Sequence, residues 1–187
     1  PIHPMPGKGE AAYRWNWDAP LLVSRHNAST IYFAANKLFK SENRGDDWST
    51  ISPDLSRQLD RNKLPVMGQV WSMDAVMKNK STTIYGNIVA LDESPIKKGL
   101  LYAGTDDGLI QITNDDGKTW LKVDAIKGVP TRTKVNMLTA SLHDENEVFV
   151  AFNSQRDGDF TPYLLRSGDR GKTWESIASN LPERGNV

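Results

Sequence analysis

Short apolar runs and polar turns alternate along almost the whole chain. In the stretch 100–120, the runs 101–104 and 109–112 flank an Asp-Gly pair, and a second polar turn leads into an apolar segment that begins at Trp120. Runs of this length bounded by Asp, Asn and Gly are typical of β-strands joined by hairpins. The pattern therefore predicts an all-β domain of antiparallel strands.

The pattern predicts three groups of four strands. The expected strands are 21–24, 31–35, 37–40 and 48–52; then 84–91, 100–104, 109–112 and 119–123; then 134–142, 147–152, 163–166 and 173–178. The polar segment 53–83 interrupts this regularity and contains one candidate helical turn, at 55–59. Because connections of this length in compact domains are usually functional or partly structured, we expect 53–83 to contribute to function.

One octet of sequence follows the third strand of every group. The copies at 41–48, 113–120 and 167–174 all fit S/T-x-N/D-x-G-x-T/D-W. The Asn or Asp can accept hydrogen bonds from its own turn, the Gly tolerates positive φ, and the Trp can cover the turn. The spacing thus predicts a structural role for twelve residues: Ser41, Asn43, Gly45, Trp48, Thr113, Asp115, Gly117, Trp120, Ser167, Asp169, Gly171 and Trp174.

These octets resemble Asp boxes, also called BNR repeats, which occur in sialidases, sortilin-type propellers and several polysaccharide-cleaving propeller enzymes. The resemblance covers nearly the whole chain and is greatest to sortilin-like, glycosyl-hydrolase-like repeat proteins secreted by bacteria. It implies an all-β fold, a β-propeller segment of about three four-stranded antiparallel blades, in which each box joins the third and fourth strands. It also implies an extracytoplasmic location, whether secreted, periplasmic or at the cell surface, in a bacterium.

The repeats divide the chain into successive segments. We expect an extended lead-in at 1–12, blade 1 at 13–52, an inter-blade insertion at 53–83, blade 2 at 84–124, a connection at 125–133, blade 3 at 134–179 and the start of a further blade at 180–187. Propellers typically close with about four to eight blades, because each blade packs against two neighbours. The expected partners are therefore the remaining blades, from the same longer chain or from other subunits.

Composition narrows the classes of partner and cofactor. The 23 basic and 23 acidic residues balance, which gives no general electrostatic case for binding nucleic acid. The chain has no Cys, which excludes disulfides and thiolate metal sites, and no apolar run approaches the roughly 20 residues of a transmembrane helix. His3, His26 and His143 are isolated in sequence, so we expect no metal and no cofactor.

In propellers of this family, ligand sites lie on the face that carries the inter-blade connections and the loops between the second and third strands. The segments 53–83, 105–108 and 153–162 are expected on that face. Long loops on a rigid scaffold are where binding residues concentrate. The candidate ligand-binding residues there are Trp71, Arg156, Asp157, Asp159 and Tyr163, and exposed Trp15 or Trp17 could also stack on a sugar ring.

A glycosidase needs two carboxyl groups held about 5–9.5 Å apart. Asp74 together with Asp106 or Asp107 could supply such a pair, although the sequence does not fix their separation. Because the boxes report fold and no catalytic pair is specified, we favour a module that binds a protein, peptide or glycan ligand. A glycoside hydrolase and a purely structural part of a larger assembly remain the alternatives.

Overall fold

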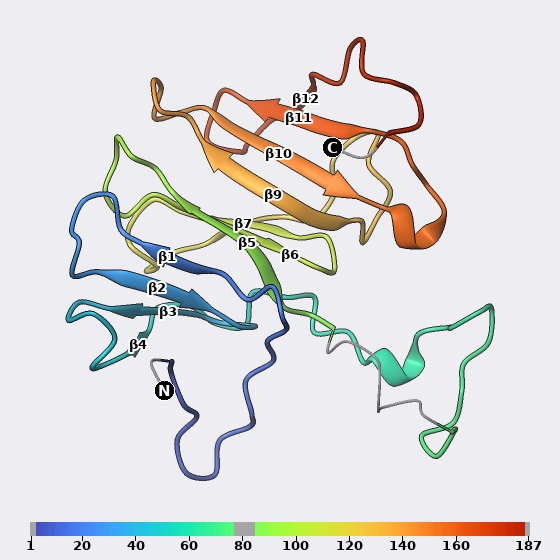
Figure 1. The fold of residues 1–187 in the computed structure, drawn as a ribbon, viewed down its shortest axis with the longest axis horizontal. Coiled ribbons are helices and arrows are strands. Elements are labelled where there is room, and N and C mark those ends of the chain that lie inside the picture. Colours follow the sequence, from blue (N-terminus) through green and yellow to red (C-terminus); the bar gives the residue numbers. More distant parts are fainter. Residues whose placement is uncertain (1–2, 77–84, 186–187) are drawn as a thin grey trace.

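The structure is a computed structural model that describes residues 3–76 and 85–185 (Figure 1). It contains three four-stranded antiparallel sheets, which we call blades 1, 2 and 3. Blade 1 comprises β1 (Leu21–Val23), β2 (Ile31–Ala34), β3 (Leu38–Ser41) and β4 (Ser49–Thr50). Blade 2 comprises β5 (Ile88–Glu93), β6 (Leu101–Thr105), β7 (Ile110–Thr113) and β8 (Leu121–Val123). Blade 3 comprises β9 (Lys134–Ala140), β10 (Val148–Asn153), β11 (Tyr163–Ser167) and β12 (Glu175–Ser176).

The predicted all-β class and the three groups of four strands are confirmed. The predicted strand at 84–91 begins outside the described residues, and β5 extends two residues further than predicted, to Glu93. The predicted helical turn at 55–59 is wrong: these residues form no helix, and Leu55 donates its N–H to the Asn36 carbonyl and buries its side chain. The described residues contain two short 3-10 turns instead, η1 (Arg61–Lys63) and η2 (Gln155–Asp157).

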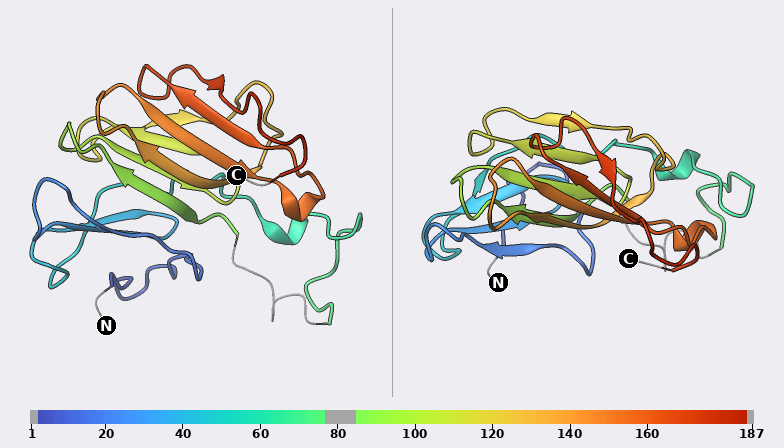
Figure 2. Two further views of the ribbon diagram at one scale, coloured as in Figure 1. Left: turned by 45° about the horizontal axis from the view of Figure 1, so that its top comes forward. Right: turned by 90° about the horizontal axis from the view of Figure 1, so that it is seen from above.

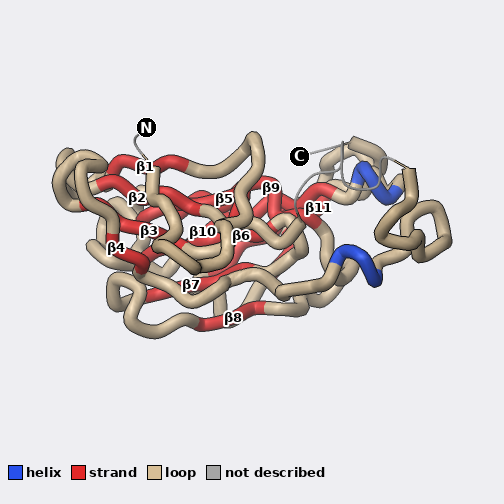
Figure 3. The backbone as a smooth tube through the Cα atoms, turned by 90° about the horizontal axis from the view of Figure 1, so that it is seen from below, coloured by secondary structure: helices blue, strands red, loops and turns tan. Residues whose placement is uncertain are grey.

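The three blades lie side by side in chain order, with η1 and the residues after it projecting away from the sheets (Figures 1 and 2). The first strand of each following blade packs against the first two strands of the blade before it: β5 contacts β1 and β2, and β9 contacts β5 and β6. The view from below shows the same succession of short strands along the body of the molecule (Figure 3). No helix in the described part of the chain is long and apolar enough to cross a membrane.

Two apolar cores lie between the blades. The core between blades 1 and 2 consists of Tyr32, Ala34, Leu38, Leu55, Ile88, Leu101 and Ala103. The core between blades 2 and 3 is larger and includes Leu100, Tyr102, Ile110, Ile112, Val135, Leu138, Val148, Val150, Phe152 and Leu165. At Gly104 the sheets approach so closely that an added Cβ would lie 2.3 Å from Cγ1 of Val135. A side chain at that position would therefore push blades 2 and 3 apart.

The three octets form near-identical turns. In each, the first hydroxyl accepts from the Gly N–H, at 2.8, 2.9 and 2.8 Å, and the third residue accepts from the seventh N–H, at 2.9, 2.9 and 2.8 Å. The Thr119 hydroxyl and backbone hold the pKa of Asp115 at about 2. At Asp169, burial acts to raise the pKa, but the hydrogen bonds from Thr173 outweigh it and hold the pKa at about 2. The carboxylates of Asp115 and Asp169 are thus occupied by their own turns, whereas Asp116 pairs with Lys40 of blade 1 at 2.6 Å.

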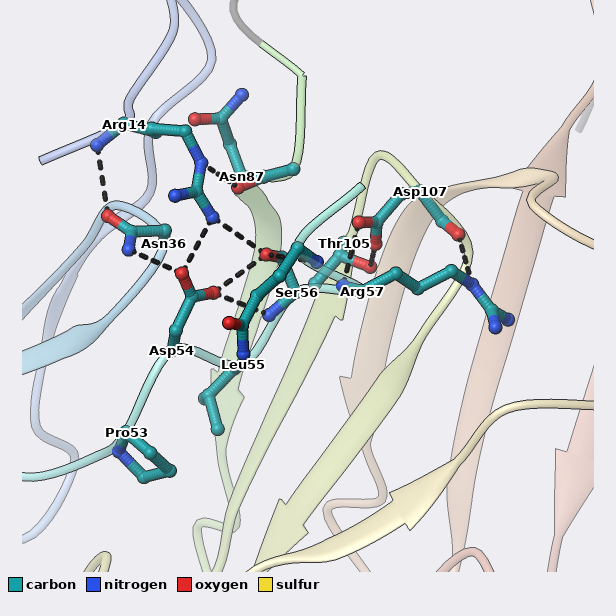
Figure 4. A network of polar contacts seen from close by, with 12 residues as sticks. Arg14, Asn36, Pro53, Asp54, Leu55, Ser56, Arg57, Asn87, Thr105 and Asp107 are labelled. Carbon is teal, nitrogen blue, oxygen red and sulfur yellow. Dashed lines mark hydrogen bonds and ion pairs between the residues drawn. The ribbon is translucent and has the colours of Figure 1, made fainter. Parts of the chain in front are cut away.

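The segment before β1 crosses the face of blade 1 that points away from blade 2. The Tyr13 ring lies 4.7 Å from the Phe39 ring, and the Trp15 ring lies 5.6 Å from the Phe33 ring, centroid to centroid. Between them, Arg14 donates to Asp54 at 2.7 Å and to the Gly86 carbonyl at 3.2 Å (Figure 4). This arginine joins the leading segment, the end of blade 1 and the start of blade 2. Trp15 is therefore a packing residue of blade 1.

Leu55 provides a direct test of the packing between blades 1 and 2. Leu55 and Leu181 each lie seven residues after the octet Trp, but Leu55 is 1% exposed and Leu181 is 38% exposed. We expect Leu55→Ala to lower the free energy of unfolding by about 2–5 kcal/mol, because it leaves a cavity in the core. The matched control Leu181→Ala should cost less than about 0.5 kcal/mol. Chemical denaturation of both variants would measure this, and equal losses would contradict the role given to Leu55.

Candidate functional site

A cleft of about 750 Å³ opens beside the junction of blades 2 and 3. It is lined by residues from the leading segment, the insertion, both blades and the connection between them: Asn16, Asp18, Leu64, Pro65, Tyr85, Val89, Asp106, Pro130, Thr131, Arg132, Lys134, Asn136, Asn153, Ser154, Gln155, Arg156, Asp157 and Asp159. The three loops predicted for the ligand face, 53–83, 105–108 and 153–162, each contribute to it. The fold therefore gathers segments that are far apart in sequence around one concave surface.

Asp106 lines the cleft and holds the start of blade 2 in place. Its carboxylate accepts hydrogen bonds from the N–H groups of Gly86 and Asn87, at 2.9 and 2.8 Å, and from the Asn87 side-chain amide at 3.1 Å. Burial raises the pKa of Asp106, and these hydrogen bonds oppose that shift. A carboxyl group with a raised pKa can act as a general acid, so Asp106 remains a chemically competent residue of the cleft.

Asp107, the other predicted carboxylate of this loop, points into the protein and not into the cleft. Its side chain is fully buried, accepts from the Thr105 hydroxyl at 2.6 Å and accepts from the Arg57 N–H at 2.8 Å. Arg57 also donates through Nε to the Asp107 carbonyl at 2.8 Å (Figure 4). Since both carboxylate oxygens have donors and neither faces the cleft, Asp107 ties the insertion to blade 2.

The residues predicted from the insertion do not line the cleft. Asp74 is exposed, and Trp71 is 43% exposed and donates its indole N–H to the Val66 carbonyl at 3.0 Å. Both belong to the segment that projects away from the sheets (Figure 1). Trp17 is fully exposed, and it also lies outside the cleft lining. The structure thus does not bring Asp74 together with Asp106 around this cleft.

The loop 153–162 supplies three predicted residues to the cleft, Arg156, Asp157 and Asp159. Tyr163 lines a neighbouring hollow but donates its hydroxyl to Asp159 at 2.6 Å. This hydrogen bond lowers the pKa of Asp159, and burial followed by the nearby carboxylate raises the pKa of Tyr163. Tyr163 therefore lies outside the cleft lining and positions the Asp159 carboxylate within it.

Several cleft residues were not predicted from the sequence. Arg132 belongs to the predicted connection 125–133, and Lys134 is the first residue of β9. Tyr85 lies just before β5. Burial, with Asp107 and Asp106 nearby, raises the pKa of Tyr85 to about 12. Lys134 forms an ion pair of 2.7 Å with Asp18, which brings the leading segment to the cleft. No short-range pattern marks these residues, because the cleft forms only when the blades associate.

Within residues 3–76 and 85–185, no group of three or more His, Cys, Asp or Glu side chains is arranged to hold a metal ion. The only aromatic lining residue of the cleft in the described part of the chain is Tyr85.

Comparisons with known proteins support the architecture. No protein-family profile and no curated protein sequence matches the chain. Among solved structures, it is similar to an ancestral GH74 enzyme with a TM-score of 0.55 and 13% identity, over 85% of this chain and 18% of that one. It is also similar to the GH74 xyloglucanase from Xanthomonas campestris, with a TM-score of 0.54 and 18% identity, over 89% of this chain and 24% of that one.

A third similar structure, YCF48 bound to D1 peptide, has a TM-score of 0.50 and 11% identity, over 85% of this chain and 38% of that one. The chain adopts a β-propeller fold. It spans between 18% and 38% of the length of these three solved chains. At sequence identities this low, the similarity shows the fold and gives no information about activity.

Asp107 gives a test of which loop carboxylates are structural. We expect Asp107→Ala to lower the free energy of unfolding by about 1–3 kcal/mol or more, because it leaves buried donors on Thr105 and Arg57 without an acceptor. The matched control Asp46→Ala removes an exposed octet carboxylate and should change stability by less than about 0.5 kcal/mol. Equilibrium denaturation would compare the two, and an unchanged midpoint for Asp107→Ala would remove this residue from the structural set.

Proposed function

We propose that the chain is a ligand-binding arc of a β-propeller that holds a protein or peptide segment in the cleft beside blades 2 and 3. The observation that carries this proposal is the cleft itself, about 750 Å³ in volume and built from six separate segments of the chain. Ligand sites in proteins are concave and combine a preformed shape with a few placed polar groups. The octet side of the blades offers fewer free polar groups, since Asp115 and Asp169 are engaged in their own turns.

The lining of the cleft favours a polypeptide over a glycan. The amide side chains of Asn136, Asn153 and Asn16 lie in it, and each can both donate to and accept from a peptide backbone. Sugar-binding sites rely on exposed aromatic rings for stacking, whereas Tyr85 is the single ring in the described lining and is half-buried. The peptide bound to YCF48 in a similar fold is consistent with this class of ligand.

The proposed module acts as part of a larger ring. The face of blade 3 that points away from blade 2 carries Met137, 61% exposed, at the position where blades 1 and 2 receive the next sheet. Further blades, from the same longer chain or from other subunits, would cover that face. The octet resemblance supports an extracytoplasmic, bacterial setting for such a ring, whether secreted, periplasmic or at the cell surface.

Blocking the cleft tests the proposal. Asn136 is exposed, lies on β9 and lines the cleft, while Thr139 is exposed on the same strand outside the lining. We expect Asn136→Trp to weaken binding to peptides at least about tenfold by filling the cleft, and Thr139→Trp to leave it unchanged. The probe is an array of immobilised short peptides of varied sequence and charge, incubated with the labelled full chain. Equal binding by Asn136→Trp and the unsubstituted chain would reject the cleft as the site.

A glycoside hydrolase is the second candidate, and one observation favours it. Asp106 and Asp159 line the same cleft, and their surroundings raise the pKa of the first and lower that of the second. Two carboxyl groups whose pKa values are displaced in opposite directions can serve as general acid and as base or nucleophile. The hydrogen bonds that each already accepts from this chain make binding the stronger proposal.

Turnover measurements separate the two candidates. If the chain is a glycosidase, it should release reducing ends from xyloglucan, and Asp106→Asn should lower the rate at least about a hundredfold by removing the general acid. Asp74→Asn, which alters an exposed carboxylate outside the cleft, is the matched control. Thermal melts would establish that both variants fold. Absence of turnover in the unsubstituted chain, or turnover that survives Asp106→Asn, would exclude Asp106 as a catalytic acid.

A further inference from the structure

The carboxylates and the cations of the cleft differ in whether they have partners within this chain. Seven charged side chains line the cleft, four carboxylates and three cations: Asp18, Asp106, Asp157, Asp159, Arg132, Lys134 and Arg156. Every carboxylate among them accepts a hydrogen bond from this chain. Asp18 is paired with Lys134 at 2.7 Å, and Asp157 accepts from the Ser154 hydroxyl at 3.4 Å. Asp106 and Asp159 accept the hydrogen bonds described above.

The two guanidinium groups differ from these carboxylates. In the described part of the chain, no carboxylate lies within ion-pair distance of Arg132 or Arg156, although ten other ion pairs are present, including that of Lys134. Both residues are exposed to solvent at the cleft. The cleft lining carries one more carboxylate than cations, but each carboxylate already accepts a hydrogen bond from this chain, so the two guanidinium groups are the charged donors left for an anionic group of a ligand.

The backbone holds Arg132 at the cleft by a tight contact. Arg132 has a φ of 68°, in the left-handed region that residues with a side chain seldom adopt. Gly108 packs on it so closely that an added Cβ would lie 2.7 Å from the Arg132 Cα. Thr133 closes the turn by donating its hydroxyl to the Pro130 carbonyl at 2.8 Å. Strained residues of this kind often occur at ligand sites, where the surrounding structure fixes them.

Arg156 approaches the cleft from the other blade. It lies in η2, whose last residue is followed by Gly158 in the left-handed conformation, with the Gly158 N–H bonded to the Gln155 carbonyl at 3.0 Å. Arg132 belongs to the connection between the blades and Arg156 to the loop between β10 and β11. A ligand bound between them would therefore contact both sides of the cleft.

We propose that Arg132 and Arg156 recognise a carboxylate of the bound peptide, so that the cleft selects acidic peptides. Guanidinium groups match carboxylates in shape and can donate two parallel hydrogen bonds to them. The amides of Asn136 and Asn153 lie in the same cleft and can pair with the peptide backbone on either side of that carboxylate. This inference rests on the proposed function and specifies the ligand more narrowly.

Matched pairs of soluble short peptides test the inference. One member of each pair carries Asp or Glu at its centre, and the other carries Asn or Gln there; all have blocked termini. For the full chain, we expect the carboxylate member to bind at least about tenfold more tightly. In Arg132→Gln/Arg156→Gln, this preference should disappear. The control Lys118→Gln/Lys172→Gln removes two exposed cations from the octet turns, and it should keep the preference.

The outcomes distinguish the inference from the proposed function. Equal binding of both peptide members by the unsubstituted chain would overturn the selection of carboxylates and leave peptide binding intact. A preference that survives Arg132→Gln/Arg156→Gln would overturn the assignment to these two arginines. No binding of any peptide would overturn the proposed function and the inference together. Thermal melts of the two double variants would show that both fold.

Discussion

The close packing of each blade on the next is the constraint on which the rest of the structure depends. A four-stranded sheet with two apolar faces is stable only when both are covered, and here the first strand of each later blade covers the first two strands of its predecessor. The contact between Gly104 and Val135 shows how little space this leaves. Because the blades are fixed by this contact, the loops at their edges are held at fixed separations, and a cleft can form there.

The two edges of the blades are used differently. On one edge, the octet turns engage the side chain at their third position, and the lowered pKa values of Asp115 and Asp169 reflect carboxylates that are already hydrogen-bonded. On the other edge, long segments cross between blades. Arg57 and Asp107 tie the insertion to blade 2, and Arg14 ties the leading segment to blades 1 and 2. Among the cations that line the cleft, Arg132 and Arg156 have no ion pair within the described residues, whereas Lys134 pairs with Asp18.

What could be predicted from the sequence follows from the range of the interactions involved. The octets and strands were predictable, because their hydrogen bonds join residues close in sequence, as Ser41 to Gly45. The prediction of a helical turn at 55–59 was wrong because Leu55 packs in the core between blades 1 and 2, and this contact with residues distant in sequence outweighs the local pattern. The sequence could not show which of Asp106 and Asp107 faces the cleft, because adjacent residues of a tight turn point in different directions and the packing of the turn decides which one is buried. Arg132 was missed because only blade association brings it to the cleft.

The repeat also explains why the cleft lies beside blades 2 and 3 and not beside blades 1 and 2. At the first junction, the connection passes from Asp54 through Ser56 directly under the Arg14 guanidinium, which fills the edge with hydrogen bonds (Figure 4). At the second junction, the Arg132 turn packs on Gly108, and its side chain has no protein counter-charge in the described chain. The same architectural edge is therefore closed by an internal arginine–carboxylate network at one junction. At the other it is left open, and Arg132 and Arg156 are exposed in the cleft.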